Sequence, residues 1–253
     1  MPTLLVISGL DPTGGAGLLA DARVAAEHQV RAVGVITAST VQDTSGVRSV
    51  LPLPAEHVGE ALAALLGDVE VDAVKIGMLG DVRIAQVIAR ALAATSAPVV
   101  WDPVFQASRG AALLEGDIEA AAAALLPEAR LVTPNLEEAG RLTGRTLASL
   151  EDMRAAAEAL VGRGAAAALI KGGHLPGDRS PDVLLDGKTA TVLDASRVAT
   201  GPVHGTGCVL SSAIAARLAH GDTLVEAARA AKHYLWQKLA TAIAIGRGAR
   251  CLV

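Results

Sequence analysis

Short apolar runs alternate with alanine-rich helical segments along the whole chain, and this alternation restricts the possible fold strongly. The runs are apolar at consecutive positions, which is typical of strands buried on both faces of a parallel sheet. Helices then connect the strands and cover the sheet. We expect an α/β fold with a mostly parallel sheet, in a single domain spanning residues 1–253. The expected strands are 3–8, 31–37, 71–77, 98–102, 130–133 and 166–171, and the expected helices are 18–29, 54–66, 81–94, 136–142, 149–163, 208–219 and 223–242.

Local signals predict where several of these elements begin. Asp81 and Ser149 are suited to cap the helices that follow them. Thr223 and Glu226 have the spacing of a capping box, in which each residue binds the backbone N–H of the other. Asp186-Gly187 lies between two apolar runs and predicts a β-hairpin.

Two stretches lack such signals. Residues 38–44 turn polar after the second strand, so we expect a loop there before a short strand at 47–53. Residues 243–253 form a short tail after the last helix, and chain ends of this kind are usually loose.

Composition excludes several classes of protein. The chain has a formal charge of −4, which argues against broad nucleic-acid binding. Its apolar runs are much shorter than the ~20 residues of a membrane span. The two cysteines, Cys208 and Cys251, fit no disulfide or zinc pattern, and no signal peptide precedes the first strand. We therefore expect a cytoplasmic protein that binds neither nucleic acid nor membrane.

The stretch His204-Gly205-Thr206-Gly207-Cys208 is the strongest candidate for chemistry. It leads directly into a helical segment, so the free N–H groups of the first helical turn adjoin two glycines. Such a place binds phosphate or other anions. We expect the thiol of Cys208 to ionise more readily there than a free thiol, whose pKa is about 8.5. The alternative is a glycine-rich turn that carries a buried structural cysteine.

Two residues near the first strands are candidates for contacting a small ligand. Asp11 lies in the glycine-rich loop 9–17, which follows the first strand but does not have the dinucleotide-binding pattern G-x-G-x-x-G. Gln42 carries an amide that both donates and accepts, so it can bind the edge of a heteroaromatic ring. Asp11 could equally serve a tight turn, and for Gln42 the residue pattern alone favours a loop residue that binds backbone.

Charged and polar residues at the ends of later strands suggest a phosphate and metal site. Asp102 ends one strand, where ligands of open α/β sheets gather, and could equally hold magnesium through water or cap a turn. Asn135 and Glu138 span a helix start and could face the same site, or simply cap the helix. Lys171 could reach a phosphate or lie in solvent. Lys75 lies inside an apolar strand and needs a partner.

Six motifs occur along the chain in this order: Gly9-Leu-Asp-Pro-Thr-Gly-Gly-Ala-Gly17, Val41-Gln-Asp-Thr44, Lys75-Ile-Gly-Met-Leu79, Thr133-Pro-Asn-Leu-Glu-Glu138, Lys171-Gly-Gly-His174 and His204-Gly-Thr-Gly-Cys208. Together they closely resemble the hydroxymethylpyrimidine/phosphomethylpyrimidine kinases of thiamine biosynthesis. The resemblance covers nearly the whole chain and implies the ribokinase-like fold, a three-layer α/β/α sandwich. It also implies ATP and Mg²⁺ as cofactors, an aminopyrimidine alcohol and its phosphate as substrates, and a homodimer.

The resemblance also implies a role for each matching residue. Gln42 would bind the aminopyrimidine, with Gly9, Asp11, Asp21 and Met78 near the substrate. Cys208 would take the place of the aspartate base of other ribokinase relatives and face the hydroxymethyl oxygen. The anion hole would consist of Gly205, Thr206 and Gly207. Lys171 would contact the ATP phosphates, and Asn135 and Thr206 would also contact the nucleotide. Asp102, Asn135 and Glu138 would order magnesium through its waters.

The chain departs from the family pattern after Asp102-Pro103-Val104. Many members have a Lys-Ser-Gly-like segment there, whereas this chain has Phe105-Gln-Ala-Ser-Arg-Gly110. That loop lies on the phosphate side of the substrate in the family, so the second phosphorylation has less support than the first. Arg109 is the candidate to replace the missing charge.

Two other functions remain open at this point. A pyridoxal or pyridoxine kinase would keep the fold and use a hydroxymethyl heteroaromatic of similar size. A non-catalytic pyrimidine sensor would bind the ring without ATP, although it would not need the phosphate-binding residues.

Overall fold

The computed structural model of the protein describes residues 1–107 and 111–253. Within these residues a large sheet forms the middle layer, and six of its strands run parallel. Across the sheet, in order, lie β11 (Thr189–Leu193), β10 (Asp182–Asp186), β9 (Ala167–Lys171), β8 (Leu131–Val132), β6 (Val99–Trp101), β4 (Ala73–Ile76), β1 (Thr3–Leu10), β2 (Arg31–Asp43) and β3 (Gly46–Pro52).

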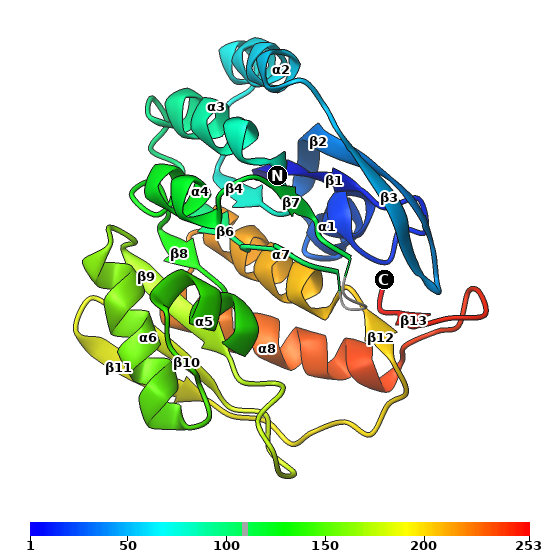
Figure 1. Ribbon diagram of the computed structural model, residues 1–253, viewed down its shortest axis with the longest axis vertical. Coiled ribbons are helices and arrows are strands. Elements are labelled where there is room, and N and C mark those ends of the chain that lie inside the picture. The colour runs from blue at the N-terminus through cyan, green and yellow to red at the C-terminus, as the bar shows by residue number, and fades with distance from the viewer. Residues whose placement is uncertain (108–110) are drawn as a thin grey trace.

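Helices cover both faces of this sheet, as Figure 1 shows. One face packs against helices in chain order: α2 (Ala55–Asp68), α3 (Val82–Leu92), α4 (Ile118–Leu125), α5 (Leu136–Thr143) and α6 (Leu150–Gly162). The other face packs against α1 (Gly17–Glu27), α7 (Thr206–Ala219) and α8 (Leu224–Ala240). The expected three-layer α/β/α architecture is confirmed. None of the helices in the described ranges has the length and apolarity to cross a membrane.

Alanine, valine, leucine and isoleucine supply most of the two cores, because the chain is only 2% aromatic. The sheet edges are antiparallel. β3 pairs with β2 at one edge, and the predicted hairpin of β10 and β11 forms the other.

The predicted helix caps are present. Asp81 accepts a hydrogen bond from the N–H of Arg83, and Ser149 accepts one from that of Asp152. Thr223 and Glu226 form the expected capping box.

The expectation of a loop at 38–44 is wrong, because β2 continues to Asp43 and pairs with β3 along this stretch. The polar residues there fit a strand whose side chains alternate between the two faces. The expectation of a loose tail is also wrong. Arg250–Cys251 forms β13, which pairs with β12 (Val203–His204), and Cys251 is buried. Figure 1 shows this red terminal segment beside β12. A further short pair joins β5 (Gly80–Asp81) to β7 (Leu114–Glu115).

Candidate active site

A cavity of about 810 Å³ opens where the central parallel strands end. The loops after β1, β4, β6 and β9 contribute to its walls, together with the start of α7 and one face of α8. Parallel sheets usually bind ligands at this edge. Most of the sequence-derived candidates line it: Gly9, Asp11, Gln42, Met78, Asp102, Asn135, Glu138, Lys171 and residues 205–208.

The turn at residues 204–208 has the geometry of an anion site. Gly205 is the N-cap of α7 and has a left-handed backbone, with φ of 83°. A side chain on Gly205 would also collide with the carbonyl oxygen of Gly15, so only glycine fits. The helix begins at Thr206, which leaves the N–H groups of its first turn without intrahelical acceptors. The anion site predicted from the sequence at residues 204–208 is therefore a helix start in the cavity wall.

Lys171 lies opposite this helix start. A Cβ built on Gly207 would be 3.1 Å from the Lys171 Nζ, so the ammonium lies close to the turn and a side chain at this position would crowd it. Lys171 Nζ donates to Asp102 Oδ1 at 2.7 Å and lies 3.9 Å from Glu138 Oε2. Burial alone would lower the pKa of Lys171, but the charges of Asp102 and Glu138 raise it. Lys171 is thus a permanent positive charge in the cavity, and the alternative of a solvent-exposed lysine is wrong.

Asp102 is almost fully buried beside Lys171. Its carboxylate also accepts hydrogen bonds from Thr133 Oγ1 at 3.0 Å and Ser211 Oγ at 3.3 Å. Burial would raise its pKa, but the charges of Lys171 and Lys75 lower it, so Asp102 is ionised at neutral pH.

Asn135 and Glu138 form a capping box at the start of α5. Glu138 Oε2 accepts from the Asn135 N–H at 2.7 Å, and Asn135 Oδ1 accepts from the Glu138 N–H at 2.9 Å. Both residues also line the cavity, so the cap directs them toward the site. Burial raises the pKa of Glu138 to about 7.

The carboxylates around Lys171 are suited to hold magnesium through water. Asp102 and Glu138 are carboxylates, which are preferred ligands of this ion. Within the described residues they are not joined by a third histidine, cysteine, aspartate or glutamate in a cluster that could enclose a metal.

Cys208 is half-buried and lines the cavity at the first turn of α7. Burial raises the pKa of its thiol to about 11, although the charge of Lys75 and a hydrogen bond from the Gly17 N–H act in the opposite direction. The expectation of a readily ionised thiol is wrong, because desolvation outweighs the effect of the helix start. Cys208 is a thiol at neutral pH.

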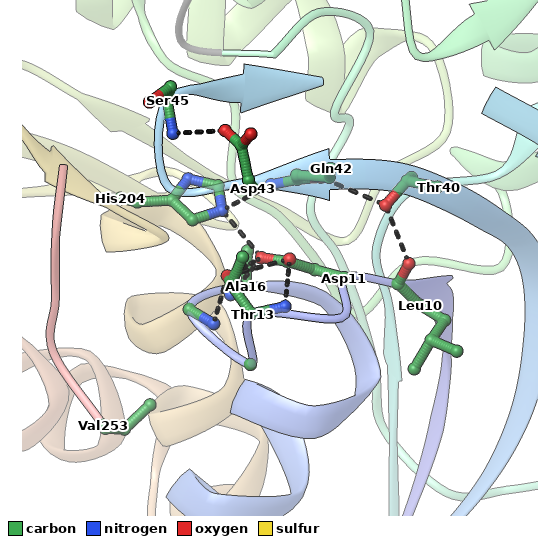
Figure 2. A network of polar contacts seen from close by, with 12 residues as sticks. Leu10, Asp11, Thr13, Ala16, Thr40, Gln42, Asp43, Ser45, His204 and Val253 are labelled. Carbon is green, nitrogen blue, oxygen red and sulfur yellow. Dashed lines mark hydrogen bonds and ion pairs between the residues drawn. The ribbon is translucent and has the colours of Figure 1, made fainter. Parts of the chain in front are cut away.

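A network of side chains lies at the other end of the cavity (Figure 2). His204 Nε2 is 2.8 Å from Asp11 Oδ2 and 3.0 Å from Gln42 Nε2, and Gln42 Oε1 accepts from Thr40 Oγ1 at 3.2 Å. Burial would raise the pKa of Asp11, but hydrogen bonds from His204 and Thr13 lower it. Asp11 is therefore a carboxylate, so the ring donates its hydrogen bond from His204 Nε2, and that nitrogen does not at the same time accept from the Gln42 amide.

This network was only partly foreseen. The Gln42 side chain accepts from Thr40 rather than binding backbone, unlike the alternative considered from the sequence. His204 was assigned no partner, although its position directly before Gly205 was a signal that it reaches the cavity.

Gly9 and Met78 lie where the resemblance implies, in the cavity wall. A side chain on Gly9 would meet Met78 Sδ at 2.8 Å, so the two residues pack closely. Asp21 does not fit the implied substrate contact. It is fully buried behind the wall, where its carboxylate binds Lys75 at 2.6 Å and Ser212 at 2.7 Å. The predicted direct role of Asp21 is therefore corrected.

Two further residues of the cavity wall, both on α8, were not singled out from the sequence. Trp236 lines the cavity, is 39% exposed, and donates Nε1–H to the Ser196 carbonyl at 3.1 Å. Lys232 pairs with buried Asp182 at 2.6 Å. Periodicity alone could not distinguish these helix residues from an ordinary surface. Arg109, the expected substitute charge, lies outside the described residues.

Comparison with known proteins gives consistent results along the chain. A family model described as phosphomethylpyrimidine kinase matches residues 11–252. The hydroxymethylpyrimidine/phosphomethylpyrimidine kinase of Rhizobium meliloti is 45% identical over 248 residues, covering 96% of this chain and 93% of the relative. The protein of the same name from Streptomyces coelicolor is 40% identical, covering 98% and 92%.

Solved structures are similar over almost the same span. The pyridoxal kinase of Staphylococcus aureus, in complex with AMP-PCP and pyridoxal, has a TM-score of 0.90 at 32% identity and covers 99% of this chain and 92% of its own. The phosphomethylpyrimidine kinase of Clostridium difficile has a TM-score of 0.82 at 33% identity, covering 94% and 99%.

Proposed function

Because the chain belongs to the phosphomethylpyrimidine kinase family, we propose that it uses ATP to phosphorylate 4-amino-5-hydroxymethyl-2-methylpyrimidine, and then its monophosphate, in thiamine biosynthesis. One observation carries this proposal. A single cavity contains an amide suited to an aminopyrimidine ring, a helix start suited to phosphate, and a lysine between two carboxylates.

The proposed roles follow from the chemistry of each group. Gln42, with Asp11, would bind the pyrimidine ring through hydrogen bonds. Thr206, Gly207 and the backbone of Gly205 would bind the transferring phosphoryl group, where preorganised N–H donors lower the barrier. Gly9 and Met78 would shape the substrate end of the cavity.

Lys171 would neutralise ATP phosphates from the opposite side, because phosphoryl transfer depends mainly on alignment and charge neutralisation. Asp102 and Glu138 would hold magnesium through water, and Asn135 would position Glu138 and adjoin the nucleotide. Magnesium, when bound, adds positive charge at the phosphates.

Cys208 would act as a positioned thiol rather than as a preformed thiolate base. Its pKa of about 11 means that the thiolate is scarce at neutral pH. A thiol at the first turn of α7 can still hydrogen-bond the hydroxymethyl oxygen and orient it toward the phosphorus. This is a weaker form of the base role that the family resemblance implies.

We further propose that residues 1–253 act as one kinase domain, as a homodimer in the cytoplasm. The nine-stranded sheet of the described residues draws strands from both halves of the chain, which supports a single domain. Two free thiols suit a reducing compartment that contains ATP.

A coupled assay with purified protein, ATP, Mg²⁺ and each candidate alcohol tests the proposal. Separation of the products counts the phosphates added, and so tests the second phosphorylation independently of the first. Cys208→Ala and Lys171→Ala should each reduce turnover at least roughly tenfold, as expected for loss of one positioned catalytic group. Lys188→Ala, at an exposed hairpin turn, is the matched control. Full activity in Cys208→Ala would remove its catalytic role.

Pyridoxal kinase activity is the second candidate, because the solved pyridoxal kinase of Staphylococcus aureus is so similar in fold. The greater identity to the pyrimidine kinase of Rhizobium meliloti favours the pyrimidine alcohol. Turnover on the two alcohols, measured side by side, decides between them. Binding of pyrimidine without phosphoryl transfer would instead indicate a sensor.

A further inference from the structure

Lys75 is a charged residue in the middle of an apolar sheet. It lies on β4 between Val6 of β1 and Val100 of β6, and none of its surface is exposed. An ammonium buried in this way is strongly destabilising unless it is paired. The reaction described above assigns it no role, so its presence at this position needs a reason.

The partner of Lys75 is Asp21. Lys75 Nζ donates to Asp21 Oδ2 at 2.6 Å, and Asp21 Oδ1 accepts from Ser212 Oγ at 2.7 Å, with all three residues fully buried. Burial alone would lower the pKa of Lys75, but the charge of Asp21 raises it. Burial raises the pKa of Asp21, against the effect of Lys75 and Ser212. The short contact and the two donors to one carboxylate favour the charged pair.

This pair lies directly behind Cys208. Ser212 follows Cys208 by four residues on α7, so both side chains occupy the same helix face. Gly17, the first residue of the helix that carries Asp21, donates its N–H to the Cys208 sulfur. The Asp21–Ser212 hydrogen bond therefore joins α1, whose first residue binds the sulfur, to α7, which carries Cys208.

Four charged groups act on the Cys208 sulfur or respond to it. Lys75 on β4 favours a negative charge there, whereas Asp21 on α1 and Asp102 after β6 oppose it. Lys171 at the end of β9 also interacts with Cys208. Of the charges, Lys75 has the largest effect, which is why a buried ammonium at this place has consequences for the site.

Space next to Lys75 adjoins the cavity floor. A Cβ built on Gly77 would lie 2.6 Å from both Lys75 Nζ and Ser8 Oγ, so the ammonium and the hydroxyl border the same small volume. Ser8 lines the cavity, and its fully buried hydroxyl has no hydrogen-bond partner within the described residues. The lysine is thus separated from the substrate end of the cavity by little more than one polar side chain.

We propose that Lys75 is a positioning residue of the phosphoryl-transfer site, which acts through its pairing with Asp21 to set the electrostatic environment of the Cys208 sulfur. The importance of this for turnover rests on the function proposed above, whereas the effect on the sulfur does not. It also gives Asp21 a role without contact to substrate.

The test measures alkylation of Cys208 by iodoacetamide as a function of pH, with the modified residue identified by peptide mass spectrometry. Asp21→Asn removes a carboxylate that opposes a thiolate at Cys208, whereas Asp102 still favours the charged form of Lys75, so the rise in alkylation should move to lower pH. One pH unit corresponds to a roughly tenfold faster reaction at a fixed pH below the pKa. Lys75→Met should move the rise to higher pH.

Cys251 is an internal control, because it is buried outside this network and is labelled faster only if the fold loosens. If Lys75→Met fails to fold, Lys75→Met combined with Asp21→Asn removes both charges and should still slow alkylation of Cys208. Shifts in the same direction for Asp21→Asn and Lys75→Met, or no shift in either, would overturn the proposal.

Kinase assays on the same variants separate this inference from the proposed function. Lys75→Met should reduce kcat by roughly tenfold or more and leave the KM for ATP nearly unchanged, because Lys171 rather than Lys75 adjoins the phosphates. If the alkylation shifts occur but the wild-type protein phosphorylates neither alcohol, the proposed function fails and the effect of Lys75 on the sulfur stands.

Discussion

Glu138 is an acid whose ionisation depends strongly on the fold. It is 8% exposed and lies beside Lys171 and Asp102, and burial raises its pKa to about 7 from an ordinary value of 4.5. Folding therefore favours its protonated form. Near neutral pH a small change in pH therefore decides whether Glu138 is ionised in addition to Asp102.

This shift has a consequence for stability that can be measured without substrate. Because the folded state binds the proton more tightly, the stabilisation from Glu138 is complete below pH 4.5 and is lost as the pH rises through about 7. At about 1.4 kcal/mol per unit, the loss is on the order of 3 kcal/mol. Urea unfolding in EDTA should show the wild type losing this much relative to Glu138→Gln between those pH values.

Glu137→Gln serves as the control, since it removes an exposed negative charge from the same helical turn. Parallel pH dependence of unfolding in the wild type and Glu138→Gln would contradict the raised pKa.

Single residues were the hardest part of the site to predict. Residue type and spacing left the roles of Lys171, Asp102 and Glu138 open, and only the family resemblance assigned them to one site; all three line the same cavity. Residue type and spacing failed for the acidity of Cys208, because the helix start is visible in the sequence but the degree of burial is not. Asp21 was misplaced for a similar reason, since its partner Lys75 is 54 residues away.

At the scale of elements, the terminal segment that ends in β13 joins two parts of the substrate end. It pairs with β12, which carries His204. Just before it, the N–H groups of Gly248 and Ala249 donate to Thr44, two residues after Gln42, at 3.0 and 2.8 Å. The segment therefore fixes the position of Gln42 relative to His204.

Ala249→Pro removes one of these donors and should weaken binding of the alcohol. Loss of one such hydrogen bond corresponds to a roughly three- to tenfold increase in the KM for the alcohol, with the KM for ATP unchanged. Steady-state kinetics with each substrate varied in turn measures both. Arg247→Ala, exposed in the same segment, is the control. An equal increase in both KM values would indicate general loosening instead.

Elements differed in how well the sequence predicted them. The starts of α3, α6 and α8 followed from caps that lie within four residues of the groups they bind. The hairpin of β10 and β11 followed from its turn. The strand at 250–251 could not be predicted in this way, because its partner at 203–204 is distant in sequence and neither segment is long enough to show a pattern. The outer half of β2 was missed for another reason, because its partner β3 follows directly in the chain but its own residues are polar enough to resemble a loop.

At the scale of the whole molecule, the two edges of the sheet differ in their surroundings. The outward face of the β2–β3 hairpin exposes Val41 and Leu51, which are 59% and 67% accessible and lie near each other in the ladder. Exposed apolar side chains grouped on an edge strand are typical of a contact surface. This edge is the one we assign to the proposed homodimer.

Leu51→Asp should therefore convert a dimer to a monomer in sedimentation velocity at micromolar concentration, because a desolvated charge opposes association. Val192→Asp, at the exposed opposite edge on β11, should leave the dimer intact. A wild-type monomer, or dissociation caused by Val192→Asp alone, would contradict this assignment.

The two tryptophans report on different parts of the molecule. Trp101 is sealed inside the sheet, whereas Trp236 borders the cavity and keeps 39% of its surface accessible. The indole emission of the native chain should thus combine a constant contribution from Trp101 with one from Trp236 that changes when nucleotide enters. Fluorescence titration can follow occupancy of the site without an added label, even in variants that no longer turn over.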